Sequence, residues 1–302
     1  MPTRLQLARK DIISFFDSGP SYIFGRRDIE QVLARNRGAW RLAQTTTFAE
    51  FLEYLLGSRK LRRIELPFPH RKETRYVWGN APIEEVLLTI KKNCHFSHLT
   101  AAQLLELSEQ DPKTIYVNHE QPPKPVSELG LSQQRIDAAF KRRPRRTRNT
   151  ATVKWSNRSQ RTVCLLNGKH TGYLGVETRT ITLPDQERAV ELRLTSVERT
   201  LIDIAVRPFY SGGIGEVLNV YRRSRNRASI NRIAGLLRKL SYVYPYHQAI
   251  GFYLESAGYE SNALDTFHKG FDFEFDFYLD YGMAETALDR KWRVHAPKGI
   301  IP

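Results

Sequence analysis

The chain has 302 residues, with 47 Lys and Arg against 32 Asp and Glu, which gives a formal net charge of +15. This length accommodates two ordinary domains or one large one. A hydrophobic content of 41% is enough to fill a core and excludes a disordered chain. The large positive charge predicts a polyanionic partner, with nucleic acid as the first expectation and a membrane surface as the second.

Two cysteines, Cys94 and Cys164, are 70 positions apart. This excludes a disulfide scaffold and a four-cysteine zinc site, and it favours a reducing compartment. The first residues show no apolar run typical of a signal peptide, and no stretch approaches the ~20 apolar residues of a membrane span. We therefore expect a cytoplasmic protein with no membrane partner.

Residues 1–80 predict three helices followed by a β-hairpin. Apolar residues recur at helical spacing over 4–16, 26–36 and 47–57, and they alternate over 61–66 and 74–78. Thr47 and Glu50 have the spacing of a capping box at the start of the third helix. This order of elements is that of a winged helix-turn-helix, in which the third helix enters the major groove and the hairpin lies along the DNA backbone.

The charge of this segment favours DNA binding, because it holds 15 Lys and Arg against 8 Asp and Glu. The basic residues expected to meet phosphate are Arg37, Arg41, Arg59, Lys60, Arg62, Arg63, Arg71, Lys72 and Arg75. Thr45, Thr46 and Thr47 are expected at the N-terminus of the third helix, whose free amides and positive dipole end suit a phosphate oxygen. Two features leave a protein-interaction module open: the long 37–46 connection, and the acidic Glu50 and Glu53 on the third helix.

Residues 81–302 predict a second domain of mixed α/β type. Its expected helices cover 83–92, 98–107, 197–206, 212–223, 229–240 and 248–257, and its expected strands cover 114–118, 162–166, 173–183, 190–194 and 271–279. Thr195 and Glu198 are expected to cap the 197–206 helix, and Arg199 and Asp203 to pair across one of its turns. The run Ser211 to Gly215 lacks the Lys-Ser/Thr of a phosphate-binding loop and indicates a flexible helix entry.

The most basic stretch is 135–161, with ten Lys and Arg and one acid, Asp137. At its centre, Arg142, Arg143, Arg145 and Arg146 predict a second contact with DNA or with an RNA-bearing partner. The alternative interpretation is a solvated segment without a partner.

Asp272, Glu274 and Asp276 are expected on one face of a strand, opposite four phenylalanines. Together with Asp280, these carboxylates could hold a metal for nuclease chemistry, for which Lys269 is the only nearby lysine that could serve catalysis. We favour a polar strand face over an aromatic core, and a docking surface for a basic partner is a third interpretation. No histidine pair or nucleophile motif indicates catalysis, so we expect no enzyme, cofactor or metal.

About the last two-thirds of the chain resembles the AbiEi antitoxins of bacterial type IV toxin–antitoxin systems. The resembling segments, in the order of the family, are SHLTAA at 97–102, IYV at 115–117, LTSVERTLIDIA at 194–205, GFYLE at 251–255 and WRV at 292–294. The resemblance implies an N-terminal winged helix that represses the protein's own operon and a C-terminal antitoxin domain. It also implies a nucleotidyltransferase-like toxin as partner and a role in phage defence.

The expectation is therefore an α+β protein with a DNA-binding domain at 1–80 and an antitoxin domain at 81–302. We expect it to repress transcription from its own operator on double-stranded DNA and to act as an antitoxin. Two alternatives remain open at this point: a transcriptional regulator without a toxin partner, and a metal-dependent nuclease that uses the acidic cluster at 272–280.

Overall fold

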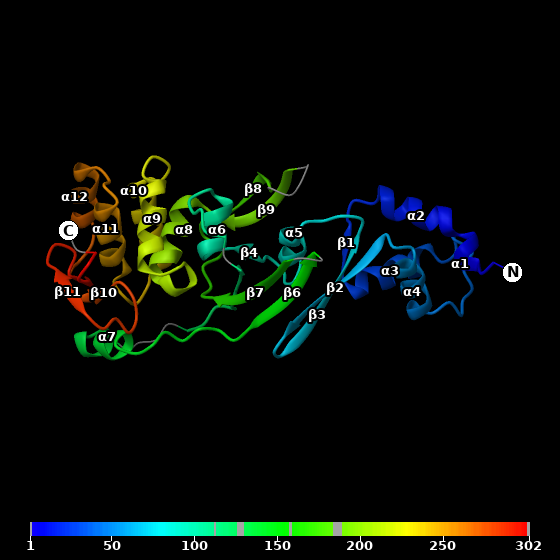
Figure 1. Ribbon diagram of the computed structural model, residues 1–302, viewed down its shortest axis with the longest axis horizontal. Helices are drawn as coiled ribbons and strands as arrows, with labels where there is room; N and C mark the ends of the chain where they lie inside the picture. Colours follow the sequence, from blue (N-terminus) through cyan, green and yellow to red (C-terminus); the bar gives the residue numbers. More distant parts are fainter. Residues whose placement is uncertain (1, 112, 126–129, 157–158, 184–188, 301–302) are drawn as a thin grey trace.

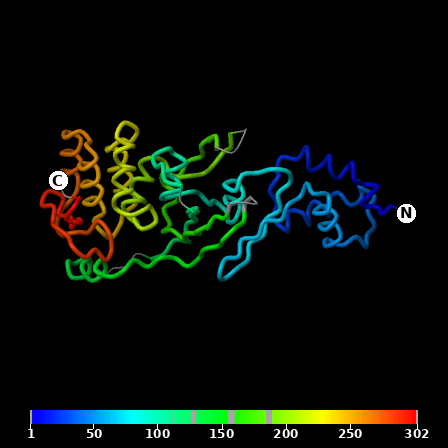
Figure 2. Tube along the Cα trace, in the orientation of Figure 1, coloured from blue at the N-terminus to red at the C-terminus, as the bar shows by residue number. Residues whose placement is uncertain are grey.

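The structure is a computed structural model that describes residues 2–111, 113–125, 130–156, 159–183 and 189–300. The molecule is elongated and of mixed α and β type, and its two termini lie at opposite ends (Figure 1). The Cα trace follows the same course, from the N-terminal helices through a central sheet to a group of C-terminal helices (Figure 2). None of the described helices is both long and apolar enough to cross a membrane.

The N-terminal part has a three-stranded antiparallel sheet of order β1-β3-β2 packed against helices. Its elements are α1 (Arg4–Leu7), α2 (Arg9–Ser18), β1 (Ile23–Phe24), α3 (Arg26–Asn36), α4 (Phe48–Gly57), β2 (Leu61–Phe68) and β3 (Arg71–Trp78). The first predicted helix is divided in two at Ala8, and the other predicted elements are present. The core between helices and sheet includes the stacked rings of Phe16 and Trp78, whose centroids are 4.8 Å apart.

Helix α4 begins as its sequence predicts. The Thr47 hydroxyl accepts a hydrogen bond from the Glu50 amide (3.2 Å), and the Glu50 carboxylate accepts one from the Thr47 amide (2.7 Å). The Thr47 hydroxyl also donates to the Glu50 carboxylate (3.0 Å), and the bonds that the Thr47 amide and hydroxyl donate lower the pKa of Glu50 below its usual value. The capping box is therefore confirmed, and it fixes where the chain turns into α4.

The β2–β3 hairpin connects the two parts of the molecule. Leu66 and Phe68, near its tip, are buried in the hydrophobic core of the C-terminal part, and β2 contacts β6 (Thr150–Ser156). The β2 residues next to the tip are therefore anchored on the C-terminal part, whereas residues 69–72 of the tip itself are exposed.

The centre of the molecule is a six-stranded sheet of order β6-β7-β5-β4-β9-β8. Its other strands are β4 (His95–Phe96), β5 (Thr114–Glu120), β7 (Ser159–Gly168), β8 (Val176–Thr182) and β9 (Ala189–Thr195). The β4–β9 and β5–β7 pairs are parallel, and the remaining pairs are antiparallel.

Helices surround this sheet and extend beyond it to a small C-terminal sheet of order β10-β12-β11 (Figure 1). The helices are α5 (Ile83–Leu88), α6 (His98–Leu104), α7 (Gln133–Phe140), α8 (Val197–Val206), α9 (Ile214–Ser224), α10 (Ile230–Leu240), α11 (Tyr246–Ser256) and α12 (Ser261–Lys269). The small sheet consists of β10 (Phe277–Tyr278), β11 (Thr286–Asp289) and β12 (Val294–Pro297). The predicted helix entry at 211–215 is present, because α9 begins at Ile214.

The expected strand over 271–279 is wrong, since only Phe277–Tyr278 form a strand there, and the preceding helix α12 was not predicted. The backbone carbonyls of this segment are bound by side chains instead of by a neighbouring strand. Arg293 donates to the carbonyls of Phe273 (2.8 Å) and Glu274 (2.9 Å), and Gln248 donates to that of Phe275 (2.8 Å). The alternation of aromatic and acidic residues thus belongs to an irregular segment whose rings pack against helices.

One close packing contact lies between α11 and the C-terminal segment. The ring of Trp292, which is fully buried, lies directly over Gly251. A Cβ atom added at Gly251 would come within 2.0 Å of Trp292 Cζ3, so only glycine fits this position of the helix.

We expect Gly251→Ala to lower the free energy of unfolding by at least ~1–3 kcal/mol, because the Trp292 ring would have to move out of a packed core. Gly235→Ala in α10 is the matched control, since a Cβ there meets no atom within 4 Å. The control should stabilise the protein by ~0.5–1 kcal/mol through its higher helix propensity. Denaturant unfolding monitored by circular dichroism measures both, and equal stabilities would contradict the assigned packing.

Candidate functional site

The predicted DNA-contacting residues of the N-terminal part differ in how free their side chains are. Arg41 and Arg59 are exposed, and within the described chain neither side chain makes a hydrogen bond or an ion pair. Arg62 and Arg63 are also exposed at the start of β2, where Arg62 donates to Asn80 (3.2 Å) and Arg63 lies over the Tyr76 ring at 5.9 Å. These four guanidinium groups remain available to solvent.

Arg37 is half-buried and is occupied within the molecule. Its guanidinium donates to the carbonyl oxygens of Ala43 (2.5 Å), Gln44 (3.3 Å) and Thr46 (2.9 Å). These bonds organise the long connection between α3 and α4, which the sequence had marked as unusual. Arg37 therefore positions the N-terminus of α4, where Thr45 and Thr47 are exposed and Thr46 is half-buried.

The basic residues of β3 are paired with acids of the same hairpin. Arg71 and Arg75 both bind Glu73, and Lys72 lies 2.7 Å from Glu65. Arg75 also donates to the carbonyl oxygens of Thr89 (2.7 Å) and Ile90 (2.9 Å), just beyond α5. Arg75 thus joins the hairpin to the C-terminal part, and Lys60 likewise is paired, with Asp17 at 2.8 Å.

The second basic group follows α7. Arg142, Arg143, Arg145 and Arg146 are exposed, and no carboxylate of the described residues lies within ion-pair distance of them. The guanidinium of Arg146 lies over the ring of Phe209 at 5.7 Å. Because α7 lies near the C-terminal sheet and α4 near the N-terminus, the two basic groups lie on different parts of the elongated molecule (Figure 1).

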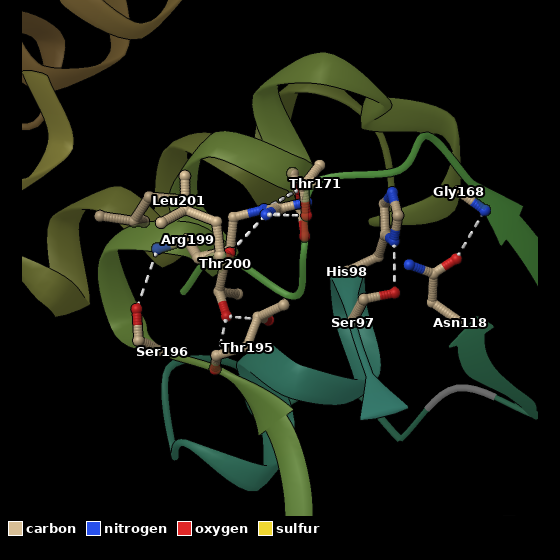
Figure 3. A network of polar contacts seen from close by, with 12 residues as sticks. Ser97, His98, Asn118, Gly168, Thr171, Thr195, Ser196, Arg199, Thr200 and Leu201 are labelled. Atoms are coloured by element: carbon tan, nitrogen blue, oxygen red, sulfur yellow. Dashed lines mark hydrogen bonds and ion pairs between the residues drawn. The ribbon is translucent and has the colours of Figure 1, made fainter. Parts of the chain in front are cut away.

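A network of buried polar side chains lies where β4, β5 and α8 meet (Figure 3). Ser97 Oγ and His98 Nδ1 are 2.8 Å apart, and Asn118 bridges His95 (3.1 Å) and the Gly168 amide (3.0 Å). The two segments 97–102 and 194–205, which carry much of the resemblance described above, come together here. The sequence did not indicate that they would be neighbours.

Helix α8 contributes a buried ion pair to this network. Arg199 Nε lies 2.8 Å from Asp203 Oδ1, as its spacing predicts, and the same guanidinium donates to the Leu174 carbonyl (2.5 Å). The predicted cap of α8 is corrected by one residue, because Ser196 and not Thr195 accepts from the Arg199 amide (3.3 Å). Thr195 instead bonds the Thr200 hydroxyl at 2.7 Å.

The electrostatics of the network follow from its burial. Desolvation lowers the pKa of both His95 and His98 to about 4, although the charge of Asp203 acts in the opposite direction. Glu120 is also enclosed, and desolvation alone would raise its pKa. Hydrogen bonds from Thr171 and Tyr173 outweigh the desolvation, so the pKa of Glu120 is lowered. At neutral pH the network therefore combines two neutral imidazoles with ionised Glu120 and a buried ion pair.

The acidic residues near the C-terminus do not form the expected cluster. Asp276 is paired with Arg293 at 2.8 Å, and the Asp280 carboxylate accepts from the Tyr281 amide (2.7 Å). Asp272 and Glu274 are exposed on the irregular segment, so the expected shared strand face does not exist. Within the part of the chain that the structure describes, no three His, Cys, Asp or Glu side chains are arranged to hold a metal ion.

The same overall fold occurs in a solved bacterial structure. The Rv2827c protein from Mycobacterium tuberculosis superimposes with a TM-score of 0.60 at 14% sequence identity, and the match covers 97% of this chain and 92% of that one. At this identity the likeness shows the fold alone. No protein-family model matches the chain, and no curated protein matches it.

The low histidine pKa values predict a stability that depends on pH. A histidine with a pKa of about 4 in the folded state and ~6.5 when unfolded binds more protons in the unfolded state between these values. The free energy of unfolding should therefore fall as the pH is lowered from ~6.5 towards 4, with a slope of up to ~1.4 kcal/mol per pH unit for each such histidine.

His98→Asn should reduce the slope of the free energy of unfolding against pH by the contribution of one histidine. Asparagine tolerates the left-handed backbone of His98, whose φ is 53°. Urea unfolding at several pH values measures the slope, and His70→Asn, at an exposed turn, is the matched control. An unchanged slope in His98→Asn would contradict a buried neutral imidazole.

Proposed function

We propose that residues 1–80 form a winged helix-turn-helix that binds double-stranded DNA and that the protein represses transcription from its own operator. The observation that carries this proposal is the arrangement of the N-terminal elements. Helices α2, α3 and α4 are followed by the β2–β3 hairpin, and β1 completes a sheet of order β1-β3-β2. That succession is the one in which a third helix serves major-groove recognition.

In this proposal the N-terminus of α4 approaches the DNA. The capping box occupies the amides of Thr47 and Glu50 and the Thr47 hydroxyl. The remaining first-turn amides and the positive dipole end attract phosphate, and the exposed Thr45 lies just before them. Arg41, exposed in the preceding connection, supplies a nearby charge. Arg37 acts indirectly, because its three hydrogen bonds hold that connection in place.

In this proposal the hairpin makes fewer phosphate contacts than a wing whose basic residues are all unpaired. Leu66 and Phe68 of its first strand pack into the C-terminal core, and Arg71, Lys72 and Arg75 are paired with Glu65 or Glu73. Arg62 and Arg63, at the base of β2, are the hairpin residues best placed to meet phosphate.

For residues 81–302 we propose an AbiEi-like antitoxin domain with a nucleotidyltransferase-like toxin as partner. The support is the sequence resemblance, together with the convergence of its segments 97–102 and 194–205 in one buried network (Figure 3). A toxin gene adjacent to this one, and rescue of growth when the two are expressed together, would test this half of the proposal.

The DNA-binding half is tested by titrating the full chain with the duplex just upstream of its gene and with a scrambled duplex, at two salt concentrations. A preference of ~10³ or more that persists at the higher salt indicates operator recognition. Equal affinities that collapse with salt would indicate generic attraction by the basic charge and would overturn the repressor assignment.

Arg41→Ala should weaken binding to both duplexes and reduce the salt slope by ~1, because one phosphate contact is lost. Arg222→Ala in α9 is the matched control, since it removes the same charge from an exposed site on the C-terminal part. Fluorescence anisotropy with a labelled duplex gives both quantities. If the control loses as much affinity as Arg41→Ala, DNA does not dock at the N-terminus of α4.

A further inference from the structure

A hollow of about 290 Å³ lies between the end of α7, the loop after it and the short helix η1 (Pro208–Tyr210). Its lining consists of Ala139, Arg142, Arg143, Pro144, Arg145, Arg207, Phe209 and Tyr281. Four of these eight residues are arginines and none is acidic. The hollow is therefore a strongly positive concavity with an apolar wall.

Arg207 is the most buried of the four arginines that line the hollow. It is half-buried, and its guanidinium donates to the Tyr281 hydroxyl (3.2 Å). Among the described residues it has no carboxylate within ion-pair distance. Burial alone would lower the pKa of Arg207, but the interactions with Tyr246 and Tyr281 outweigh it and raise that pKa, and the charge of Arg207 also acts on Asp280. The guanidinium is therefore charged, and its remaining N–H groups can donate to an added anion.

The apolar wall consists of aromatic rings that contact one another. Tyr281 stacks on Phe140 with ring centroids 4.3 Å apart and meets the Phe209 ring edge-on at 6.2 Å. Arg146 covers Phe209 from another side at 5.7 Å. Asp280, the acid adjacent in sequence, is engaged by the Tyr281 amide and does not line the hollow.

We propose that this hollow binds a nucleoside phosphate. Arginine forks bind phosphate oxygens in pairs, so Arg142, Arg143, Arg145 and Arg207 would hold the phosphates. The rings of Phe209 and Tyr281 offer an apolar surface for the base. The volume is at the lower end of the range of small-molecule pockets, which suits a mononucleotide and not a DNA duplex. This site does not depend on the DNA-binding proposal.

The test is isothermal titration of the full chain with ATP, AMP and inorganic pyrophosphate, without added metal. ATP and AMP should bind with a 1:1 stoichiometry, and pyrophosphate more weakly because it lacks the base. Phe209→Leu should reduce the difference in affinity between ATP and pyrophosphate, because the ring that contacts the base is removed. Pyrophosphate binding as tightly as ATP would overturn the nucleoside assignment.

The double variant Arg143→Ala/Arg145→Ala should weaken ATP binding by at least tenfold, and both side chains are exposed, so the fold should be retained. Arg148→Ala, in the same loop but outside the hollow, is the matched control and should bind ATP almost as the unmodified protein does. Absence of binding by either nucleotide, or an equal loss in Arg148→Ala, would overturn the proposal. Duplex binding by the same variants shows separately whether this loop also contacts DNA.

Discussion

The buried pair of Arg199 and Asp203 is the interaction on which the C-terminal architecture depends. Every residue of α8 is buried, including these two charged ones, so the helix can occupy the centre only if both charges are satisfied there. The Leu174 carbonyl takes a further hydrogen bond from Arg199. Gly175, with φ 73°, lets the chain pass so close that a Cβ would lie 2.8 Å from Arg199 Cβ. Loss of either partner would leave a buried charge, at a cost of ~3–5 kcal/mol.

Around α8 the polar network determines which segments can be neighbours. The imidazoles of His95 and His98 remain neutral because they are desolvated, and Asn118 of β5 joins β4 to β7 through His95 and Gly168. His98 adopts a left-handed backbone conformation within this setting. A network of this kind specifies one arrangement of sheet and helices, because each buried polar group must find its partner.

Local patterns in the sequence predicted the parts of the structure that depend on neighbours along the chain. The capping box of Thr47 and Glu50 and the four-residue spacing of Arg199 and Asp203 are such cases. The segment 271–276 could not be predicted in this way, because its carbonyls are bound by Gln248 and Arg293, which are distant in sequence. The role of Arg37 was missed for a related reason, since nothing in its position distinguishes a phosphate contact from a bond to the backbone.

The candidate sites likewise combine features that the sequence predicts with features that only the three-dimensional structure shows. Basic residues were found from composition, but the pairing of Lys72 with Glu65 required the register of β2 and β3, and the pairing of Arg71 and Arg75 with Glu73 required knowing that the three share one face of β3. The hollow beside α7 combines a recognisable arginine run with Arg207, Phe209 and Tyr281, which come from later parts of the chain. Composition alone could mark the run as basic but could not show that it encloses a volume.

The distribution of charge also constrains how the proposed DNA-binding part would work. The exposed surface of α4 carries Glu50 and Glu53 and no basic residue, and the Glu50 carboxylate lies at the N-terminus itself, where it is bonded to the Thr47 amide. The helix can therefore attract phosphate only through its remaining first-turn amides and its dipole. Neutralisation of phosphate must then come from its flanks, from Arg41 on one side and Arg62 or Arg63 on the other. An acidic side chain in the groove can accept from the amino group of cytosine. In the proposed DNA-binding mode the flanking arginines would supply affinity, and α4 would contribute discrimination between sequences more than binding strength.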